Sequence, residues 1–303
     1  MNDLHEGRIT AVIVTYNRKE LLKECVQALL NQSVKECDVL IIDNASTDGT
    51  PEYIADELKN SRVHYDNTGS NLGGAGGFCY GIRKACEMGY DYLWLMDDDC
   101  IVKENSLKEL LKLGNSLQGN YGFLSSRVLW KDGTPCRMNQ QKISLVKKLK
   151  EPEKDCQKIV LATFVSLFVP ASVIRNVGLP YKEFVIWTDD WEYTRRISLK
   201  YPCYYSAKSI VVHKSKNNDG PAIETADEGL LERFSYMYRN ETVLYRREGI
   251  KGRILFWIRR EMHKKRIRKS SLSDDEKKRR IQLMDEAVEK GKKFYPQIEY
   301  PGK

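Results

Sequence analysis

The chain has 303 residues, enough to bury a sizeable core, and its 41% hydrophobic and 30% charged residues are typical of a globular protein. Its eight cysteines include no Cys-x-x-Cys pair, which argues against a zinc knuckle and a disulfide framework and favours a reducing cytosol. The net charge of +8 is concentrated in residues 246–269, where 11 Lys and Arg face two acids, so the rest of the chain sums to about −1.

No membrane-spanning segment is expected. The longest uncharged run, residues 159–174, contains Pro170 and is shorter than the roughly 20 residues that a spanning helix needs. Residues 1–6 carry acids and lack the basic-then-apolar order of a signal peptide. We therefore expect a cytoplasmic protein.

The first half of the chain alternates strand and helix patterns. Residues 9–15 and 38–43 are apolar runs too continuous for half-exposed strands, and apolar positions recur at helical spacing over 19–32 between them. This order predicts an α/β sheet whose ligand site lies beyond the carboxyl ends of its strands. Further strands are predicted at 62–65, 90–96, 123–130, 158–169 and 204–212, and further helices at 50–59, 78–85, 106–117 and 171–177.

Three carboxylates, residues 97–99, follow the strand predicted at 90–96. Adjacent acids repel one another unless a cation or strong donors lie between them, and oxygen ligands suit Mg²⁺ or Mn²⁺. A solvated acidic turn is the alternative, and an isolated triplet favours it. Two other strand ends, at Thr15 and Asp43, bring polar groups to the same edge of the sheet, which favours a shared site.

Five glycines occur within residues 69–77. They would let the backbone approach a ligand closely, and a helix beginning near Phe78 would direct its first amides at an anion. The spacing matches neither the dinucleotide-binding fingerprint nor a Walker loop. A tight connection without function is the alternative explanation.

A second acidic cluster follows the apolar residues 184–187. Asp189, Asp190 and Glu192 open a predicted helix, where acids suit the helix dipole, so simple capping is one explanation. Trp187 and Trp191 bracket the cluster, and tryptophan faces commonly stack on sugar rings, which favours a binding role.

The order of these motifs resembles the inverting, nucleotide-sugar-dependent glycosyltransferases of family 2, which have the GT-A fold. The resemblance covers about two-thirds of the chain, residues 8–215, and each motif is weak alone. The galactofuranosyltransferases and their rhamnosyltransferase relatives look most similar. The matching motifs are residues 14–18, 42–50, 71–78, 97–99 and 187–192 and, at the end of the strand predicted at 204–212, His213.

The resemblance implies a role for each matched residue. Asp97, Asp99 and His213 would bind Mn²⁺ or Mg²⁺ on the donor diphosphate. Asp190 would be the general base, which accepts the proton of the attacking hydroxyl on the side of the sugar opposite the metal. Donor contacts would come from Thr15, Asn17, Asp43, Gly73, Gly74 and Asp98, and acceptor contacts from Trp187, Asp189 and Glu192.

After a catalytic domain at 1–215, residues 216–303 are expected to form a helical, basic region. Within 250–262 the apolar residues, Trp257 among them, share one helical arc opposite basic residues, which is typical of an interfacial membrane helix. A helix docked on the catalytic domain is the alternative, and nucleic acid is not expected because no recognition fold accompanies the charge. A last helix is predicted at 273–290, a loosely held tail after Phe294, and a surface excursion at 131–155.

The sequence thus predicts a metal-dependent inverting glycosyltransferase. It would move galactofuranose from UDP-galactofuranose to a glycan or lipid-linked acceptor in cell-surface polysaccharide synthesis, bound peripherally to the inner face of the cell membrane through 246–269. A rhamnosyltransferase using dTDP-rhamnose and a non-catalytic sugar-nucleotide-binding or scaffolding protein remain alternatives, and homo-oligomerisation is left open. Because the first core strand starts by Ile9, we expect no N-terminal domain like that of mycobacterial galactan polymerases, and the addition of one or few sugars.

Overall fold

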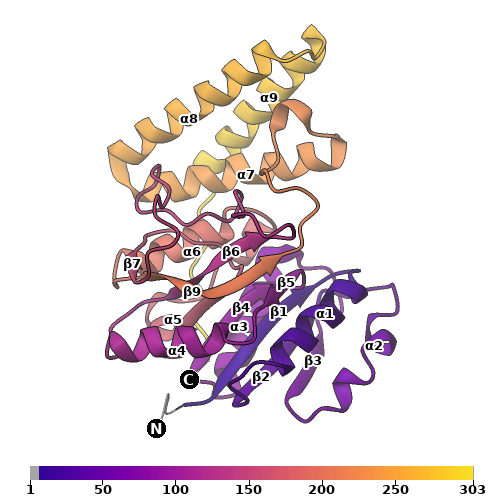
Figure 1. Cartoon of the computed structure of the whole chain (residues 1–303). Coiled ribbons are helices and arrows are strands. Elements are labelled where there is room, and N and C mark those ends of the chain that lie inside the picture. Colours follow the sequence, from indigo (N-terminus) through magenta and orange to yellow (C-terminus); the bar gives the residue numbers. More distant parts are fainter. Residues whose placement is uncertain (1–6, 303) are drawn as a thin grey trace.

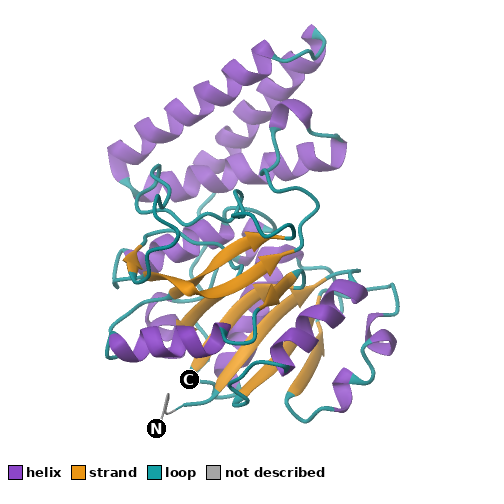
Figure 2. Cartoon of the chain, viewed as in Figure 1, coloured by secondary structure: helices purple, strands orange, loops and turns teal. Residues whose placement is uncertain are grey.

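The computed structural model describes residues 7–302, so the prediction for residues 1–6 lies outside it. A twisted sheet with helices on both faces forms the lower part of the molecule in Figure 1, and the C-terminal helices form a separate layer above it. Figure 2 shows that strands are confined to the lower part.

The strands are β1 Ile9–Thr15, β2 Cys37–Asp43, β3 Val63–Asn67, β4 Tyr92–Asp97, β5 Cys100–Val102, β6 Leu124–Trp130, β7 Gln157–Lys158, β8 Leu167–Pro170 and β9 Tyr204–His213. The helices are α1 Lys19–Leu30, α2 Thr50–Tyr53, α3 Gly73–Glu87, α4 Ser106–Ser116, α5 Ala171–Val177, α6 Asp189–Ser198, α7 Glu228–Arg247, α8 Gly249–Lys269 and α9 Asp274–Lys292, with 3-10 turns η1 Glu57–Lys59, η2 Lys182–Phe184 and η3 Ile223–Thr225.

The predicted α/β sheet is confirmed. Its strands follow the order β3-β2-β1-β4-β8-β6-β9-β5, with β7 attached to β9. β1 to β4 pair in parallel, which brings their carboxyl ends to one edge, whereas β8 runs antiparallel to both β4 and β6. The acidic triplet therefore lies near the middle of the sheet, at the edge where the parallel strands end.

Both faces of the central strands are buried, as their continuous apolar runs predict. Along β1, Val12 and Val14 face a core that includes side chains of α3, α5 and α6, whereas Ala11 and Ile13 face a core that includes side chains of α1 and α4. This alternation is the period-two side-chain pattern of a strand. The sheet is thus fixed from both sides.

Several predicted elements have different bounds. The helix predicted at 50–59 is broken into α2 and η1, and the strand predicted at 158–169 is divided into β7 and β8 by a buried irregular segment. The short strand β5 was not predicted. The helix predicted from about Phe78 begins at Gly73, so most of the glycine-rich stretch is helix rather than a loop before it.

The C-terminal region consists of α7, α8 and α9. Helices were predicted at the positions of α8 and α9, whereas no separate helix was predicted at the position of α7. α7, α8 and α9 share a hydrophobic core against which Trp187 and Trp191 also pack. No helix within residues 7–302 is long and apolar enough to cross a membrane.

The prediction of a loosely held tail is wrong. Phe294 and Ile298 pack against a buried cluster that includes Phe184. The backbone N–H of Leu179 donates to the carbonyl oxygen of Glu299 at 2.7 Å, so the tail is fixed on the segment that follows α5.

Candidate active site

The site begins where β1 and β4 end side by side. Oγ1 of Thr15 donates to Oδ2 of Asp98 at 2.8 Å, and Nη1 of Arg18 lies 3.2 Å from Oδ1 of Asp98 and 3.0 Å from Oδ2 of Asp99. Asp98 and Asp99 are both buried. A guanidinium therefore provides part of the positive charge that three adjacent carboxylates require.

Strand pairing brings His213 to this edge although it is more than a hundred residues from the triplet. Cys100 of β5 pairs with His213 of β9, and the N–H of Lys214 donates to the carbonyl oxygen of Asp99 at 2.9 Å. As a result, Nε2 of His213 lies 3.0 Å from Oδ1 of Asp99.

The residues at this edge fit a divalent cation. Asp97, Asp99 and His213 each offer a ligand atom, and these atoms lie within 4.8 Å of one another. Oδ1 of Asp99 is buried, and no described donor reaches it at a hydrogen-bonding angle. An orphaned carboxylate oxygen beside an imidazole nitrogen and a second carboxylate is a donor set that suits Mn²⁺ as well as Mg²⁺.

The electrostatics of the cluster also favour a cation. Burial raises the pKa of Asp97 to about 7, and the Asp99 carboxylate adds to this shift. Burial alone would lower the pKa of His213, but its contact with Asp99 raises the pKa to about 10. Asp97 and His213 thus bind protons more tightly than an ordinary carboxylate and imidazole do, and a bound cation would displace these protons.

Asn139 orients the histidine. Nδ1 of His213 lies 2.8 Å from Oδ1 of Asn139, whose Nδ2 donates to Oγ1 of Thr163 at 3.1 Å. Since the amide oxygen only accepts, Nδ1 carries the proton and Nε2 faces the carboxylates. Residues 131–155 were predicted to be a surface excursion, but Asn139, Gln141 and Lys142 of this segment are buried, so that prediction is wrong for its central part.

Replacing Asn139 with alanine should weaken Mn²⁺ binding by about 10–100-fold, because loss of the group that orients a histidine ligand typically has an effect of this size. Titration calorimetry with Mn²⁺ measures it. Gln140→Ala is the matched control, since Nε2 of Gln140 bonds to the carbonyl oxygen of Leu149 in the same segment. Equal Mn²⁺ affinities for the two variants would contradict the role given to Asn139.

The predicted donor residues form a second part of the site. Asp43 is fully buried, accepting the N–H of Ser46 at 2.8 Å and the hydroxyl of Tyr65. Oδ1 of Asn17 accepts the N–H of Thr47 at 2.7 Å, which ties the loop after β1 to the loop after β2. The side chains of Asp43 and Asn17 are thus held in place at one sheet edge.

The glycine-rich stretch brings α3 close to the sheet. A Cβ on Gly77 would lie 2.6 Å from Cγ1 of Val14, and Gly73 has a φ of +73° with the carbonyl oxygen of Val185 where a Cβ would point. Such contacts require glycine. A Cβ on Gly74 would meet no atom within 4 Å, which leaves room beside the first turn of α3.

The second acidic cluster lies at the start of α6. Burial raises the pKa of Asp190 well above its usual range, and Asp189 and Asp97 add to the shift. Asp190 and Asp97 are therefore close enough for their charges to interact. A raised pKa makes a carboxylate a stronger proton acceptor once it is ionised.

Two predicted acceptor residues have partners inside the protein. The indole of Trp187 packs edge-on against Phe234 of α7, with ring centroids 5.3 Å apart. The carboxylate of Glu192 is buried between Arg196, at 2.9 Å, and Arg247, at 2.8 Å. We therefore assign Glu192 a structural role in place of the predicted acceptor contact, whereas buried Asp189 stays beside Asp190.

Sequence reasoning missed Arg18, Asn139 and Lys142. Nζ of Lys142 lies 3.4 Å from the ring centroid of Trp191, and burial lowers the pKa of Lys142 to about 8. The positive charge of Lys142 partly offsets the rise in the pKa of Asp190. Arg18 had a signal, since it is a cation three residues after the end of β1, but Asn139 and Lys142 lie in a segment without periodicity.

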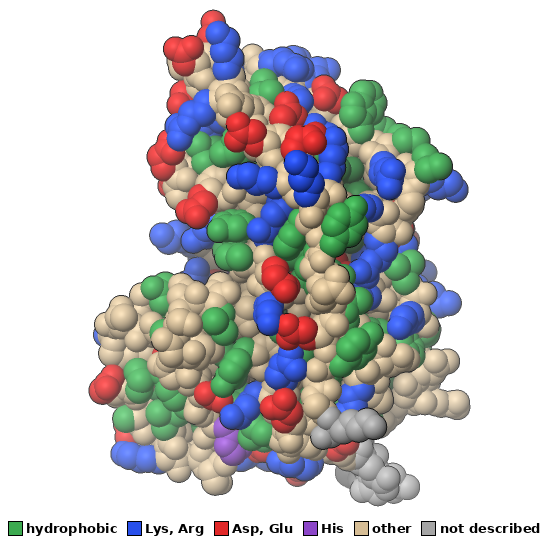
Figure 3. Space-filling model, turned by 180° about the vertical axis from the view of Figure 1, so that it is seen from behind, with side chains coloured by type: hydrophobic (Ala, Val, Ile, Leu, Met, Phe, Trp, Pro, Cys, Tyr) green, Lys and Arg blue, Asp and Glu red, His purple; other side chains and the backbone are tan. Residues whose placement is uncertain are grey.

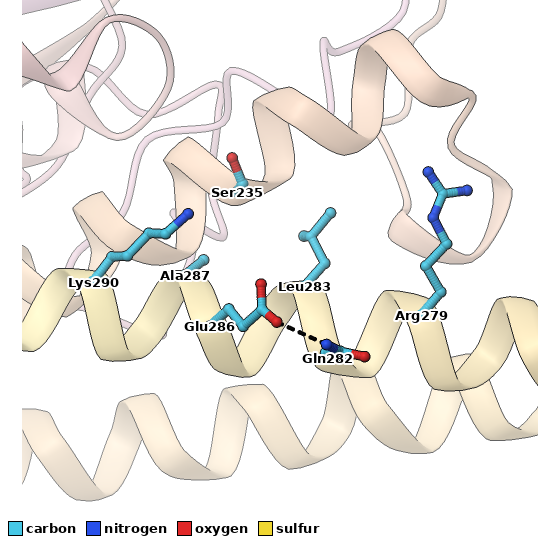
Figure 4. A pocket seen from close by; sticks show the side chains of 7 residues that line it. All are labelled: Ser235, Arg279, Gln282, Leu283, Glu286, Ala287 and Lys290. Carbon is cyan, nitrogen blue, oxygen red and sulfur yellow. Dashed lines mark hydrogen bonds between the residues drawn. The ribbon is translucent and has the colours of Figure 1, made fainter.

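A cavity of about 340 Å³ lies elsewhere, between α7 and α9 (Figure 4). Nε2 of Gln282 donates to Oε1 of Glu286 at 2.8 Å along its wall. None of the candidate site residues lines it. We therefore do not include this cavity in the candidate active site.

A family model for glycosyl transferase family 2 matches residues 10–160. The chain is 36% identical over 95 residues to a galactofuranosyltransferase of Mycolicibacterium smegmatis, a match that covers 31% of each chain. It is 37% identical over 108 residues to an undecaprenyl-phosphate mannosyltransferase of Micrococcus luteus, covering 35% of this chain and 43% of the other. Each match thus covers less than half of the relative's own length.

Solved structures extend the likeness in fold to most of the chain. TarS residues 1–349 from S. aureus superpose with a TM-score of 0.57 at 12% identity, covering 92% of this chain and 71% of the other. A mannosyltransferase from Pyrobaculum calidifontis, solved with GDP-Man and Mn²⁺, gives a TM-score of 0.53 at 12% identity, covering 95% and 74%. The predicted GT-A fold is confirmed, and the chain belongs to glycosyl transferase family 2.

Proposed function

We propose that the protein is a cation-dependent inverting glycosyltransferase that moves a galactofuranosyl residue from UDP-galactofuranose to a glycan or lipid-linked acceptor. The observation that carries this proposal is a site with two sides. Asp97, Asp99 and His213 offer three ligand atoms within 4.8 Å, and Asp190 lies within electrostatic reach of Asp97. The galactofuranosyltransferase among the relatives supports the choice of sugar.

The residues suit the two demands of an inverting transfer. A cation held by Asp97, Asp99 and His213 would stabilise the negative charge that builds on the departing diphosphate. Asp190 would accept the proton of the acceptor hydroxyl as it attacks the anomeric carbon from the opposite side. Thr15, Asn17, Asp43, Gly73, Gly74 and Asp98 would contact the donor, and Trp187 and Asp189 the acceptor.

A panel of UDP-, dTDP- and GDP-sugars tests the proposal. Each is added with Mn²⁺ or Mg²⁺, and thermal stabilisation and slow hydrolysis of the donor are measured. We expect cation-dependent stabilisation with UDP and faster hydrolysis of UDP-galactofuranose than of UDP-galactopyranose. A response to dTDP-rhamnose alone would indicate a rhamnosyltransferase. Binding of a nucleotide sugar with neither hydrolysis nor transfer would indicate a non-catalytic protein.

We also propose that α8 lies on an anionic membrane surface. Five large hydrophobic side chains of α8 are exposed: Ile250 at 77%, Ile254 at 53%, Trp257 at 59%, Ile258 at 43% and Met262 at 63%. Lys251, Arg253, Lys265 and Arg268 are exposed on the same helix. An apolar stripe with flanking cations is complementary to an anionic bilayer.

The basic residues opposite this stripe face the protein. Arg259 pairs with the buried Glu241 of α7 at 3.0 Å, and Lys264 pairs with Asp285 of α9 at 2.7 Å. On the rear face in Figure 3, Lys and Arg are interspersed with Asp and Glu over the C-terminal helices. The helix is therefore docked through ion pairs, and its apolar stripe is left toward solvent.

Replacing Trp257 and Ile258 together with serine should lower partitioning onto phosphatidylglycerol vesicles by about 10²–10⁴-fold, because each buried side chain contributes about 1.5–3 kcal/mol. Vesicle sedimentation measures the partitioning. Leu199→Ser, at a residue 51% exposed outside α8, is the control. If the unaltered protein does not bind vesicles and instead forms dimers that the double substitution disrupts, the apolar stripe of α8 is a subunit interface.

A further inference from the structure

Asn240 of α7 contacts the segment that leads into α6. Its side chain is fully buried, and Nδ2 lies 2.9 Å from the carbonyl oxygen of Phe184, 3.2 Å from that of Ile186 and 2.9 Å from that of Trp187. All three partners are acceptors, so only a donor group satisfies them together. The Asn240 amide thus donates hydrogen bonds to three carbonyl oxygens of residues 184–187.

The loop that Asn240 contacts is strained. Val185, Trp187 and Thr188 have φ angles of 64°, 60° and 71°. Non-glycine residues in this region cost of order 1–3 kcal/mol each, and a β-branched residue such as Val185 is especially unsuited to it. Such a conformation persists only where its surroundings fix it.

The same loop also contacts the glycine-rich helix. The carbonyl oxygen of Val185 accepts the N–H of Ala75 at 3.0 Å. The loop is therefore held between the first turn of α3, on the donor side of the site, and Asn240 of α7. A change at either contact displaces the residues that follow.

The residues that follow are Asp189 and Asp190, the first two of α6. We propose that Asn240 is a positioning residue, which holds segment 185–188 in its strained path so that Asp190 faces the donor side of the site. The inference rests on the proposed function for the role of Asp190. It makes α7 part of the catalytic unit rather than an accessory to it.

Asn240→Asp tests this proposal, because aspartate keeps the size of the side chain and replaces the amide N–H donors with carboxyl oxygens. We expect kcat to fall by about 10–100-fold, since small displacements of a reacting group have effects of this order. The KM of the donor should change less than kcat, because most of the proposed donor residues lie at the ends of β1, β2 and β4 rather than on segment 185–188. Asn240→Ala, which adds no acceptor, replaces this variant if the aspartate prevents folding.

Hydrogen exchange of peptides spanning 184–192 supplies a readout that needs no turnover, and exchange should be faster in both Asn240 variants. Tyr238→Phe is the matched control, because Tyr238 lies on α7 as Asn240 does. The substitution removes a buried hydrogen bond of 2.7 Å between the Tyr238 hydroxyl and Nδ1 of His263 on α8. It should lower the melting temperature and leave kcat and the exchange of 184–192 unchanged.

Two results would overturn the proposal. One is unaltered kcat and unaltered exchange of 184–192 in the Asn240 variants. The other is an equal fall in kcat and an equal acceleration of exchange in Tyr238→Phe. Absence of any transfer by the unaltered protein would sink the proposed function instead. The exchange data would then still report whether Asn240 holds the loop.

Discussion

Replacing Asp190 with asparagine should lower kcat by about 10²–10⁴-fold, the range that a general base contributes. The asparagine keeps the shape of the side chain, and it accepts no proton from the acceptor hydroxyl. Nucleotide binding should be unaffected, because the predicted donor contacts lie at the ends of β1, β2 and β4 and at the start of α3. Steady-state transfer assays, with calorimetric titration of UDP in the presence of Mn²⁺, measure the two effects separately.

Asp189→Asn is the control for this experiment, because burial raises the pKa of both carboxyl groups at the start of α6. It should reduce turnover far less than Asp190→Asn does. The reverse order of effects would assign the base to Asp189. Full activity of both variants would exclude a base at the start of α6.

Replacing Asp99 with asparagine should abolish the thermal stabilisation that nucleotide and Mn²⁺ produce together. It should lower kcat/KM by about 10³-fold, since charge stabilisation of the leaving group is worth several kcal/mol. The carboxylate has two tasks, because it faces Nε2 of His213 with one oxygen and Nη1 of Arg18 with the other. An amide supplies neither charge.

Asp91→Asn is the matched control, since Asp91 adjoins the opposite end of β4 and accepts the N–H of Arg8 at 2.8 Å. Melting curves with UDP, Mn²⁺, both and neither measure the coupling. Wild-type coupling in Asp99→Asn would show that the nucleotide binds without a cation at this edge.

The sheet and its polar edge could be predicted from the sequence because they depend on local pattern. β1, β2 and β4 are continuous apolar runs ending in polar groups, and parallel strands bring their ends together by geometry. That is enough to predict that Thr15, Asp43 and the acidic triplet at 97–99 lie at the same edge of the sheet.

The parts that could not be predicted depend on tertiary contacts. Glycine has low helix propensity, so a helix beginning at Gly73 is explained by tertiary packing, of Gly73 against Val185 and of Gly77 against Val14 of β1. Asn139 lies in a segment with no periodicity, and its role follows from the side chain of His213. Asn240 lies on a helix whose pattern says nothing about the carbonyls it contacts.

The pairing of β5 with β9 has a consequence for how the site tolerates change. Cys100 lies opposite His213, and successive side chains on a strand point to opposite faces. Lengthening or shortening β9 by one residue would turn the imidazole away from Asp99, although every ligand residue would still be present. The capacity to hold a cation is therefore encoded in strand register as much as in composition, and chains that keep all three ligands can lose it through a single insertion.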